Sequence, residues 1–371
     1  MPWADVDDLN GQFECILYGN LYTDYGTIIQ NIKHKTNTDL KVKSKGNEVL
    51  IPGSDTTPTG LARALFLEKE NVILGGDINI LSVKHDDGPF LAYELNKLKK
   101  ELIIRIKGTT VKHLQNNDLK DIVVSLPSLE EQRKISSLFS RLDNTITLQQ
   151  RKLNSLQKLK KGLLQKMFPK NGENIPEIRF PEFSDAWKQR KVGDLLVERR
   201  EMVTEDNEYP LMAFIANEGV APKGDRFDRS ALVKNADSKK YKRTKYGDFI
   251  YSSNNLESGS IGLNKYGKAS ISPVYSIFYP TNLADSDFIG RYFLRKDFIG
   301  QMIRWRQGVV YGQWKIPEAD FLNIDIYIPS KDEQEKIGQI LDKVDNTITL
   351  QQRKLEFLQK LKKGLLQQMF I

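Results

Sequence analysis

The chain has 371 residues, of which 39% are hydrophobic and 28% are charged, and it carries a formal charge of +8 at pH 7. This length predicts two domains rather than one core, and no apolar run approaches the roughly 18 residues of a membrane span. The start of the chain lacks the basic and then apolar pattern of a secretory signal. A single cysteine, Cys15, excludes an internal disulfide, so we expect a cytoplasmic protein. The basic charge favours a polyanionic partner such as nucleic acid.

Residues 1–126 predict a globular domain of α+β type. Runs of β-branched residues bounded by Gly, Pro, Asn and Asp predict strands within residues 49–55, 71–83 and 121–127. Between the last two runs, apolar residues at mixed spacings of three and four predict a helix over residues 89–106. The irregular order of these elements favours α+β structure over a regular βαβ array.

A long helix is predicted over residues 127–168. Ser128 and Glu131 have the spacing of a capping box, in which both side chains satisfy backbone donors at the helix start. Apolar residues then alternate four and three apart, which is the heptad pattern of a coiled coil, with polar interruptions at Gln149 and Lys160. At ~1.5 Å per residue, such a helix is on the order of 55–60 Å long. Its single apolar stripe requires a partner helix.

The end of the chain, residues 329–371, repeats this helix. Each position from 329 to 370 corresponds to one from 127 to 168 at a constant offset of 202, without a gap, and Ser330 and Glu333 repeat the capping-box spacing. We therefore expect the two helices to pack against each other along their seams. The outward face that carries Lys158, Lys160 and Lys161 is either solvated charge or a surface for another protein.

The segment between the helices divides into a linker and a second domain. Residues 169–186 are rich in Pro, Gly and Asn, which cannot continue a helix and predict a linker. Residues 187–328 then repeat the order of elements predicted for the first domain, although the residues differ. Two scaffolds with nearly identical helices and divergent domains indicate a shared assembly role and two separate recognition roles.

No catalytic constellation stands out in the sequence. It contains no phosphate-binding loop, no dinucleotide fingerprint, and neither HExxH nor paired CxxC spacing. The three histidines, His34, His85 and His113, all lie in the first domain, so an active site present in both halves cannot use them. Asp143 and Asp345, on the two helices, are interpreted as structural. We therefore expect a chain without catalytic residues, bound cofactor or metal.

Basic and amide side chains in variable segments are the candidates for nucleic-acid binding. The densest basic run, residues 234–246, contains six Lys or Arg and one Asp, and can neutralise several phosphates; the alternative is a solvated loop. Arg can read guanine, and Asn or Gln can read adenine. Variable segments just before the long helix, residues 107–114 and 307–314, carry such side chains in both domains. The DNA-binding candidates are Lys33, Lys35, Lys43, Thr56, Thr57, Arg63, Thr109, Thr110, Lys112 and His113 in the first domain, and Lys239, Lys240, Lys242, Arg243, Lys245, Asn254, Asn255, Arg304, Arg306, Gln307 and Gln313 in the second.

Four motifs resemble those of a known family. The helices open PSLEEQRKI and PSKDEQEKI, both continue to LQKLKKGLLQ, and IPEIRFPEFSDAWKQRKVGDLL leads into the second domain. Over nearly the whole chain the pattern resembles the specificity subunit of a type I restriction-modification enzyme. The resemblance implies two target recognition domains of mixed α/β structure, residues 1–126 and 187–328. It also implies that the two long helices pack as an antiparallel coiled coil with pseudo-twofold symmetry.

The resemblance also implies a function. Such a subunit is a sequence-specific DNA-binding protein, not an enzyme, and reads a bipartite double-stranded target with its two domains. It recruits two modification (methyltransferase) subunits, which hold S-adenosylmethionine, and restriction subunits, which use ATP and Mg, can join them. A helix of the predicted length can bridge half-sites one duplex turn apart, ~34 Å, if the packing is antiparallel.

One segment departs from the family pattern, and alternatives for the function stay open. The lead-in matched by residues 178–196 has no clear copy before the first domain. We expect a shortened first domain, a divergent start around residues 3–9, or an incomplete gene product. The alternative function is a non-catalytic coiled-coil interaction protein that binds nucleic acid without sequence preference. A further alternative is that the chain itself transfers methyl groups.

Overall fold

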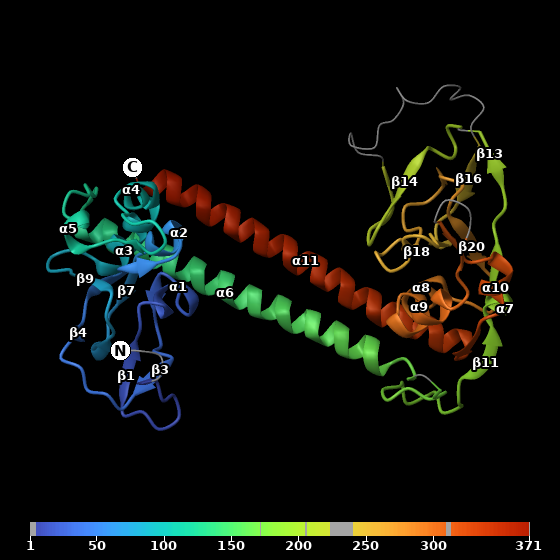
Figure 1. Ribbon diagram of the computed structural model, residues 1–371, viewed down its shortest axis with the longest axis horizontal. Coiled ribbons are helices and arrows are strands. Elements are labelled where there is room, and N and C mark those ends of the chain that lie inside the picture. The colour runs from blue at the N-terminus through green and yellow to red at the C-terminus, as the bar shows by residue number, and fades with distance from the viewer. Residues whose placement is uncertain (1–4, 171, 205, 223–239, 309–312, 371) are drawn as a thin grey trace. The chain divides into compact units, whose positions relative to one another are not determined.

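The computed structural model describes residues 5–170, 172–204, 206–222, 240–308 and 313–370 (Figure 1). The chain divides into two compact units, the first formed by Met1–Leu153 with Gln351–Ile371 and the second by Asn154–Leu350. Each unit therefore combines a globular domain with parts of both long helices, α6 (Leu129–Lys166) and α11 (Lys331–Met369). None of the described helices is long and apolar enough to span a membrane.

The globular domain of the first unit contains two four-stranded sheets with the orders β3-β1-β8-β4 and β2-β7-β5-β9. Pairing is antiparallel except between β1 and β8 and between β2 and β7. Val49, Ile51 and Phe66 of the second sheet pack against Ala92 and Leu95 of the helix that follows it. The strands are β1 (Phe13–Ile16), β2 (Ile28–Ile29), β3 (His34–Thr36), β4 (Lys43–Lys45), β5 (Glu48–Pro52), β6 (Ser54–Asp55), β7 (Leu65–Leu67), β8 (Glu70–Leu74), β9 (Ile78–Ser82) and β10 (Lys112–His113), and the short helices are α1 (Asn20–Thr23), α2 (Pro58–Leu61) and α5 (Asn116–Leu119).

Two predicted elements of this domain are divided in the structure. The run over residues 71–83 forms β8 and β9, which are separated by a turn whose Asp77 has a φ of 61°. The predicted helix over residues 89–106 forms α3 (Gly88–Lys97) and α4 (Lys99–Ile104), because Leu98 leaves the helical region at ψ 21°. Asp87 caps α3 by accepting a 3.0 Å hydrogen bond from the Phe90 amide.

The globular domain of the second unit is built around a cluster of aromatic side chains. Phe249, Tyr251, Phe278, Phe293 and Phe321 are fully buried and lie in ring contact with one another. The sheets have the orders β12-β20-β17-β18, β13-β16-β19, β14-β15, β11-β23 and β21-β22. Their strands are β11 (Lys188–Lys191), β12 (Leu196–Glu198), β13 (Met202–Val203), β14 (Met212–Ile215), β15 (Gly219–Pro222), β16 (Tyr241–Thr244), β17 (Phe249–Tyr251), β18 (Ile261–Leu263), β19 (Ala269–Ile271), β20 (Ser276–Pro280), β21 (Gln307–Gly308), β22 (Trp314–Lys315) and β23 (Asp325–Ile328), and the helices are α7 (Val192–Leu195), α8 (Ser286–Phe293), α9 (Lys296–Ile303) and α10 (Glu318–Leu322).

The strand predicted within residues 121–127 does not form, and this prediction was wrong. In the second unit the equivalent segment is β23, which pairs in antiparallel register with β11 of the lead-in. Nothing in the described part of the first unit takes the place of β11, so residues 123–126 have no partner for a ladder. The described part of the start does not take this place, since Val6 bridges to Thr36 and Leu9 is 91% exposed. The predicted divergent start around residues 3–9 lies partly outside the described residues, because Trp3 is not described.

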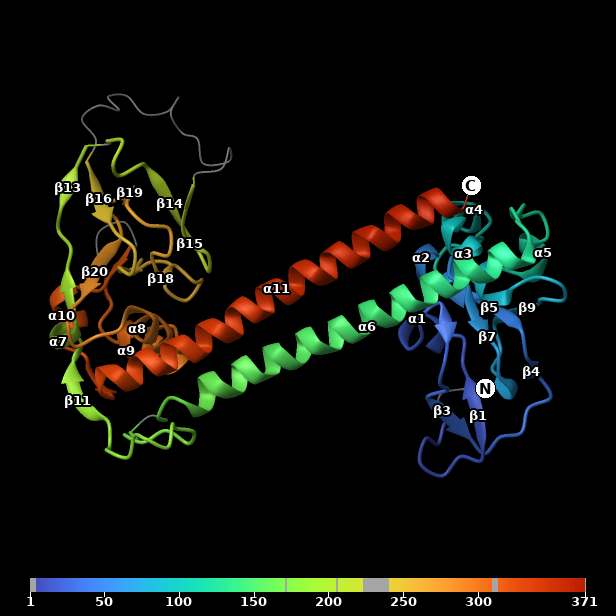
Figure 2. The ribbon, with the colours of Figure 1, turned by 180° about the vertical axis from the view of Figure 1, so that it is seen from behind.

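Within the first unit, the start of α6 packs against the end of α11. Ile135 and Phe139 of α6 form a buried cluster with Phe90, Tyr93 and Phe370, which follows α11, and both helices lie beside α3 (Figure 2). Their directions are opposite, as expected for an antiparallel coiled coil. Polar contacts accompany the seam, since Lys362 pairs with Asp143, and the Gln351 amide donates to the Gln149 backbone oxygen at 3.2 Å.

The second unit repeats this packing with the roles of the helices exchanged. Leu163 and Met167 at the end of α6 pack with Ile337 and Leu341 at the start of α11. Lys160 pairs with Asp345 at 2.7 Å, which is the equivalent of the Lys362 contact 202 residues away. The polar interruptions of the heptads are thus paired across the seam, and the prediction of an antiparallel coiled coil is confirmed.

Candidate nucleic-acid interface

A buried glutamine joins each globular domain to its long helix. Gln132 accepts a 2.9 Å hydrogen bond from the Asp87 amide, and its own amide donates to Asp86 and to the Pro127 carbonyl, both at 2.9 Å. Gln334 accepts a 3.0 Å hydrogen bond from the Asp285 amide, and its own amide donates to the Leu283 and Pro329 carbonyls at 3.1 Å, so a backbone carbonyl takes the place of the Asp86 carboxylate. Both side chains are buried. The P-S-x-x-E-Q motif therefore fixes the N-termini of α3 and α8 against the helices that follow the domains.

The capping boxes predicted from the same motif form only in part. Ser128 and Ser330 accept hydrogen bonds from the amides three residues later, each at 3.4 Å. The returning glutamate contact is not made among the described residues, because the Glu333 carboxylate is taken by Arg179 in two 2.7 Å hydrogen bonds. The equivalent Glu131 is exposed.

In the first domain, two chain segments that are distant in sequence lie together just before α6. β6 pairs with β10 in antiparallel register, so Ser54 lies opposite His113. The Ser54 hydroxyl lies 3.1 Å from Nδ1 of His113, and the Leu114 amide donates to the Gly53 carbonyl at 3.0 Å. We call residues 53–60 and 107–113 the first loop pair. It brings together the predicted residues Thr56, Thr57, Thr109, Thr110, Lys112 and His113.

The second domain holds an equivalent arrangement. The Ile316 amide donates to the Ser253 hydroxyl at 3.0 Å, and the Trp314 amide to Asn254 Oδ1 at 2.5 Å. Arg306 pairs with Glu257 at 2.8 Å. We call residues 253–257 and 304–315, without the undescribed 309–312, the second loop pair. It gathers Asn254, Asn255, Arg304, Arg306, Gln307 and Gln313. The amide that bonds the two segments, that of Ile316, is 202 positions from the Leu114 amide, which bonds the segments of the first loop pair.

Side chains suited to DNA contact are exposed in both loop pairs. Thr56, Thr57, Thr109, Thr110 and His113 are exposed in the first, and Asn254, Asn255, Arg304, Gln307 and Gln313 in the second. Two tryptophans of the second loop pair were not among the predicted DNA-binding residues, although Trp305 is 44% exposed and Trp314 is 50% exposed. The alternation of Arg and Trp in residues 304–306 was the available signal, since aromatic rings among basic residues suit stacking on bases.

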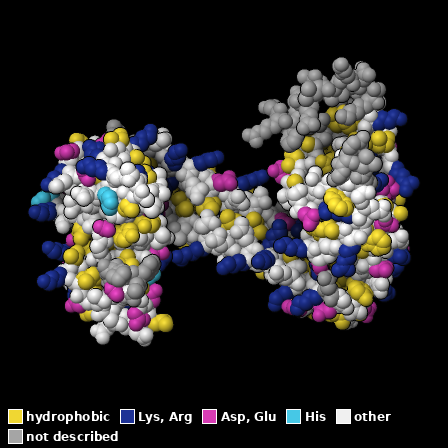
Figure 3. All heavy atoms as spheres, in the orientation of Figure 1, with side chains coloured by type: hydrophobic (Ala, Val, Ile, Leu, Met, Phe, Trp, Pro, Cys, Tyr) yellow, Lys and Arg dark blue, Asp and Glu magenta, His cyan; other side chains and the backbone are white. Residues whose placement is uncertain are grey.

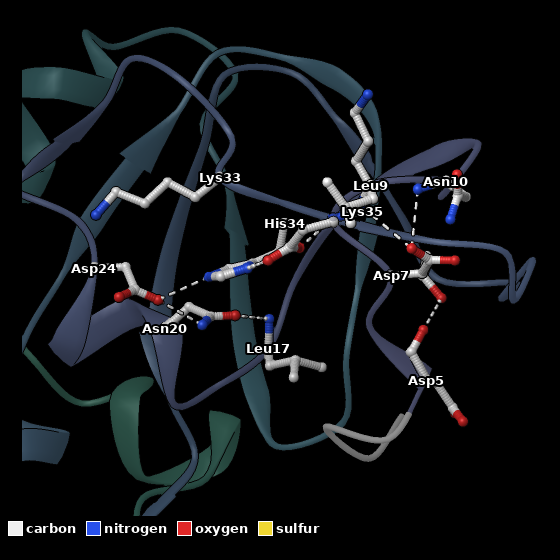
Figure 4. Close-up of polar contacts among 12 residues, drawn as sticks. Asp5, Asp7, Leu9, Asn10, Leu17, Asn20, Asp24, Lys33, His34 and Lys35 are labelled. Atoms are coloured by element: carbon white, nitrogen blue, oxygen red, sulfur yellow. Dashed lines mark hydrogen bonds and ion pairs between the residues drawn. The ribbon is translucent and has the colours of Figure 1, made fainter.

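The basic side chains of residues 33–43 lie on a different part of the first domain. Lys33 and Lys35 flank His34, the first residue of the edge strand β3, and the ring of His34 lies 3.1 Å from both Asp8 and Asp24. Figure 4 shows Asp24 beside His34. Lys43, on the opposite edge strand β4, pairs with Asp39 at 2.7 Å. The structure therefore does not gather these three lysines with the first loop pair.

Two predicted arginines are engaged inside their own domains. Arg63 donates to the carbonyls of Tyr22 and Tyr25 at 3.1 and 2.5 Å, and burial lowers the pKa of its guanidinium. Arg243 pairs with Glu201 and Asp206, both at 2.5 Å, and its guanidinium lies 4.3 Å from the Tyr209 ring centre. The guanidinium groups of both arginines are therefore engaged in contacts within the protein.

The densest basic run is in part a strand rather than a loop. Residues 241–244 form β16, paired with β13 and β19, and Lys242 donates to the Tyr275 carbonyl at 2.9 Å. Lys240 and Lys245 at its ends are exposed, whereas Lys239 lies outside the described residues. Of the phosphate-binding candidates in this run, the structure presents Lys240 and Lys245 to solvent.

Comparisons with known proteins place the chain in a family. A model described as "Type I restriction modification DNA specificity domain" matches residues 2–158 and 184–360. The chain belongs to this family. The type I restriction enzyme MjaVIII specificity subunit of Methanocaldococcus jannaschii is 23% identical over 350 residues, covering 89% of this chain and 79% of that protein. The putative MjaX specificity subunit of the same organism is 25% identical over 141 residues, 35% of this chain and 33% of its own.

A solved structure has the same fold as this type I specificity protein. The S subunit of a type I restriction-modification system from M. genitalium aligns over 100% of this chain and 91% of its own, with a TM-score of 0.59 and 15% identity. Each of the two stretches that the family model matches contains one loop pair and the start of one long helix. Both domains of this DNA specificity protein therefore carry the same framework.

Proposed function

We propose that this type I specificity protein reads a bipartite DNA target, with one loop pair for each half. The observation that carries this proposal is the recurrence of the loop pair: a loop after a central strand is bonded to the segment before the long helix in both domains. The donor amides, Leu114 and Ile316, are 202 residues apart, the acceptors are the Gly53 carbonyl and the Ser253 hydroxyl, and the exposed side chains of the two loop pairs differ. A constant framework with different exposed donors and acceptors is what two readers of different sequences require.

The exposed side chains suit direct readout of bases. Arg304 can donate a pair of hydrogen bonds to guanine, and Asn255 or Gln313 can pair with adenine. In the first loop pair, the hydroxyls of Thr109 and Thr110 accept or donate with less discrimination. Lys240 and Lys245 supply positive charge for phosphates, a contact that positions the protein on DNA without reading sequence.

We propose that the long helices recruit two methyltransferase subunits and set the separation between half-sites. Exposed lysines on the end of α6, Lys158 and Lys161, recur as Lys360 and Lys363 on α11, and Figure 3 shows basic side chains along the described surface of the helices. Two copies of one surface suit two copies of one partner. Restriction subunits would join that complex.

In this proposal the chain itself is not catalytic. The methyltransferase subunits bind S-adenosylmethionine, and the restriction subunits use ATP and Mg. The alternative function, a coiled-coil interaction protein that binds nucleic acid without sequence preference, is not favoured, since the family model matches both domains as DNA specificity domains.

The test is base-resolution mapping of methylated sites in cells that carry the chain with its methyltransferase subunit. Arg304→Ala should relax or abolish recognition of one half of the motif, with a loss of about 1–3 kcal/mol of discrimination at one base pair. Thr110→Ala, in the first loop pair, is the matched variant and should affect only the other half. Lys245→Ala should weaken binding to all sequences and lower the salt slope by about 1. An unchanged motif for both loop variants would refute the assignment.

The spacing role has a separate test. Inserting seven residues, about two helical turns, at equivalent positions within residues 144–153 and 346–355 should change the accepted spacer between half-sites. Methylated motifs with an unchanged spacer would remove the helices from this role and leave the base-reading proposal standing.

A further inference from the structure

The strands that lead into the two loop pairs, β5 and β17, can be aligned residue by residue. A buried carboxylate stands at the start of each strand, Glu48 in the first domain and Asp248 in the second. Each accepts a hydrogen bond from the amide three residues earlier, at 3.1 and 2.7 Å. At the far end, Gly53 and Ser253 accept the amides that bond the loop pairs together. Both pairs of residues differ by 200 in number, so this offset aligns the residues that follow.

Under this alignment, Asp55 of the first loop pair corresponds to Asn255 of the second. Asn255 is exposed, and its side-chain amide makes no hydrogen bond with a described residue. Asp55 is partly exposed and ends β6, where it lies opposite Lys112 of β10. At one equivalent position beside the exposed loop residues, the first domain therefore carries an acid and the second carries an amide.

No cation pairs with Asp55 in the part of the chain that the structure describes. Its carboxylate accepts hydrogen bonds from the amide and hydroxyl of Thr56 at 2.6 and 3.3 Å and from the Thr57 hydroxyl at 3.0 Å. Lys112 donates instead to the Gly108 carbonyl at 2.7 Å. A carboxylate has about four lone-pair sites. The neutral donors therefore orient the Asp55 carboxylate, leave its charge uncompensated and leave room for one donor from outside.

The Asp55 carboxylate lines a shallow cavity of about 590 Å³ beside the first loop pair, together with Tyr22 and Lys99. Gly60 lies directly against the carboxylate, because a Cβ added to Gly60 would lie 1.6 Å from Asp55 Oδ2. Any other residue at position 60 would displace the carboxylate. Glycine at this position therefore allows the carboxylate to keep its orientation.

A carboxylate in a loop that contacts DNA weakens binding to every sequence unless a base supplies a donor, because the phosphates repel it. In the major groove the 4-amino group of cytosine donates, and Asp accepts from it. Adenine also carries an amino group, but its neighbouring N7 is an acceptor that repels the second carboxylate oxygen. Asn offers both a donor and an acceptor, which suits adenine. An acid and an amide at one position therefore select different bases.

We propose that Asp55 is a specificity-determining residue that accepts a hydrogen bond from the 4-amino group of a cytosine in the first half of the target. Asn255 holds the same place in the second domain and reads an adenine. This inference rests on the proposed function, because it requires that the loop pairs face the edges of the bases. It adds that one shared position selects cytosine or adenine by the exchange of an acid for an amide.

Mapping of methylated sites tests the exchange, with the first half defined as the half that Thr110→Ala alters. Asp55→Asn should shift the preference at one position of that half from cytosine towards adenine, by about 5- to 150-fold. Gly60→Ala displaces the carboxylate without changing the charge and should relax the same position. Asp77→Asn removes an exposed carboxylate beside Gly53, whose amide donates to the Asp77 carbonyl, and should leave the motif unchanged. Thermal melts verify that the variants remain folded.

Binding of the chain with its methyltransferase subunits to modified duplexes tests the amino group itself. Each cytosine of the first half is replaced in turn by an analogue that lacks the 4-amino group. One replacement should weaken binding of the native complex by about 5- to 150-fold relative to its effect on the Asp55→Asn complex. Equal effects of every replacement on the two complexes overturn the proposal, as does a first half without cytosine in either strand.

The outcomes also separate this inference from the proposed function. If Asp55→Asn weakens binding to all bases equally, the carboxylate only holds the loop and the inference is wrong. If Thr110→Ala changes the motif and Asp55→Asn does not, the inference fails while the proposed function stands. If neither these variants nor Arg304→Ala changes the motif, both fail.

Discussion

The buried glutamine of the second long helix offers the sharpest test of how each domain is held on its helix. Gln334 is fully buried and makes three hydrogen bonds, one from the Asp285 amide and two to backbone carbonyls. Replacing it by Met keeps a similar volume and removes every one of these bonds. Each buried group left unpaired costs about 1–3 kcal/mol, so Gln334→Met should lower the free energy of unfolding by about 3–5 kcal/mol. Typical domains have ~5–15 kcal/mol in total.

The loss should also be local. Denaturant unfolding gives the magnitude, and hydrogen exchange should accelerate in α8, whose first turn depends on the Asp285 amide. Gln132→Met is the matched variant, and it should accelerate exchange in α3 instead. A loss below about 1 kcal/mol for Gln334→Met would show that water or relaxation replaces the three bonds. Equal acceleration of α3 and α8 by either variant would contradict the assignment of each glutamine to its own domain.

Two further predictions concern the polar contacts of the helix seam. Burial opposes ionisation of Asp345, but hydrogen bonds from Lys160 and Arg291 outweigh it and lower its pKa. Its ionised form therefore stabilises the fold at neutral pH, and this stabilisation is lost as the pH falls below the ordinary value of 3.8 through the lower folded value. Asp345→Asn should lower the free energy of unfolding by about 1–2 kcal/mol at pH 7. The difference in unfolding midpoint between the variant and the native chain should shrink as the pH is lowered. A difference that stays constant down to pH 2 would argue against the pairing. The Gln149→Leu, Gln351→Leu double variant should raise the free energy of unfolding by about 1–2 kcal/mol, since a packed apolar pair often exceeds a buried polar one, and a lower unfolding midpoint would contradict this expectation.

The long helices could be predicted well from the sequence, whereas the strand at residues 121–127 could not. A heptad pattern is a local property, and it specifies the seam wherever the partner helix lies. The segments at 121–127 and 323–329 have the same apolar alternation, yet only the second forms a strand. The difference lies in β11, a partner distant in sequence. A strand is defined by its ladder, so side-chain alternation alone overpredicts it.

For the candidate interface, the position along the chain could be predicted from the sequence, whereas the exposure of individual side chains could not. Residues before each long helix were expected to read DNA from their position, and the structure brings them together with loops over 50 residues away in sequence. Arg243 and Arg304 look alike as sequence letters. In the structure, however, Arg243 pairs with two carboxylates, whereas Arg304 is exposed. Exposure depends on tertiary contacts, which composition does not contain.

Phe370, which directly follows α11, completes an aromatic cluster of the first domain. Phe370 stacks on Phe90 at 5.0 Å between ring centres, and its carbonyl accepts a hydrogen bond from Lys97, 273 residues earlier. On the ribosome, the first domain therefore emerges with its aromatic cluster open and the seam of α6 unpaired. Such surfaces are prone to aggregate until their partners arrive. The packing of the first domain is therefore complete only after the second domain and α11 have been translated, so chaperone dependence during synthesis should be greater for the first domain than for the second.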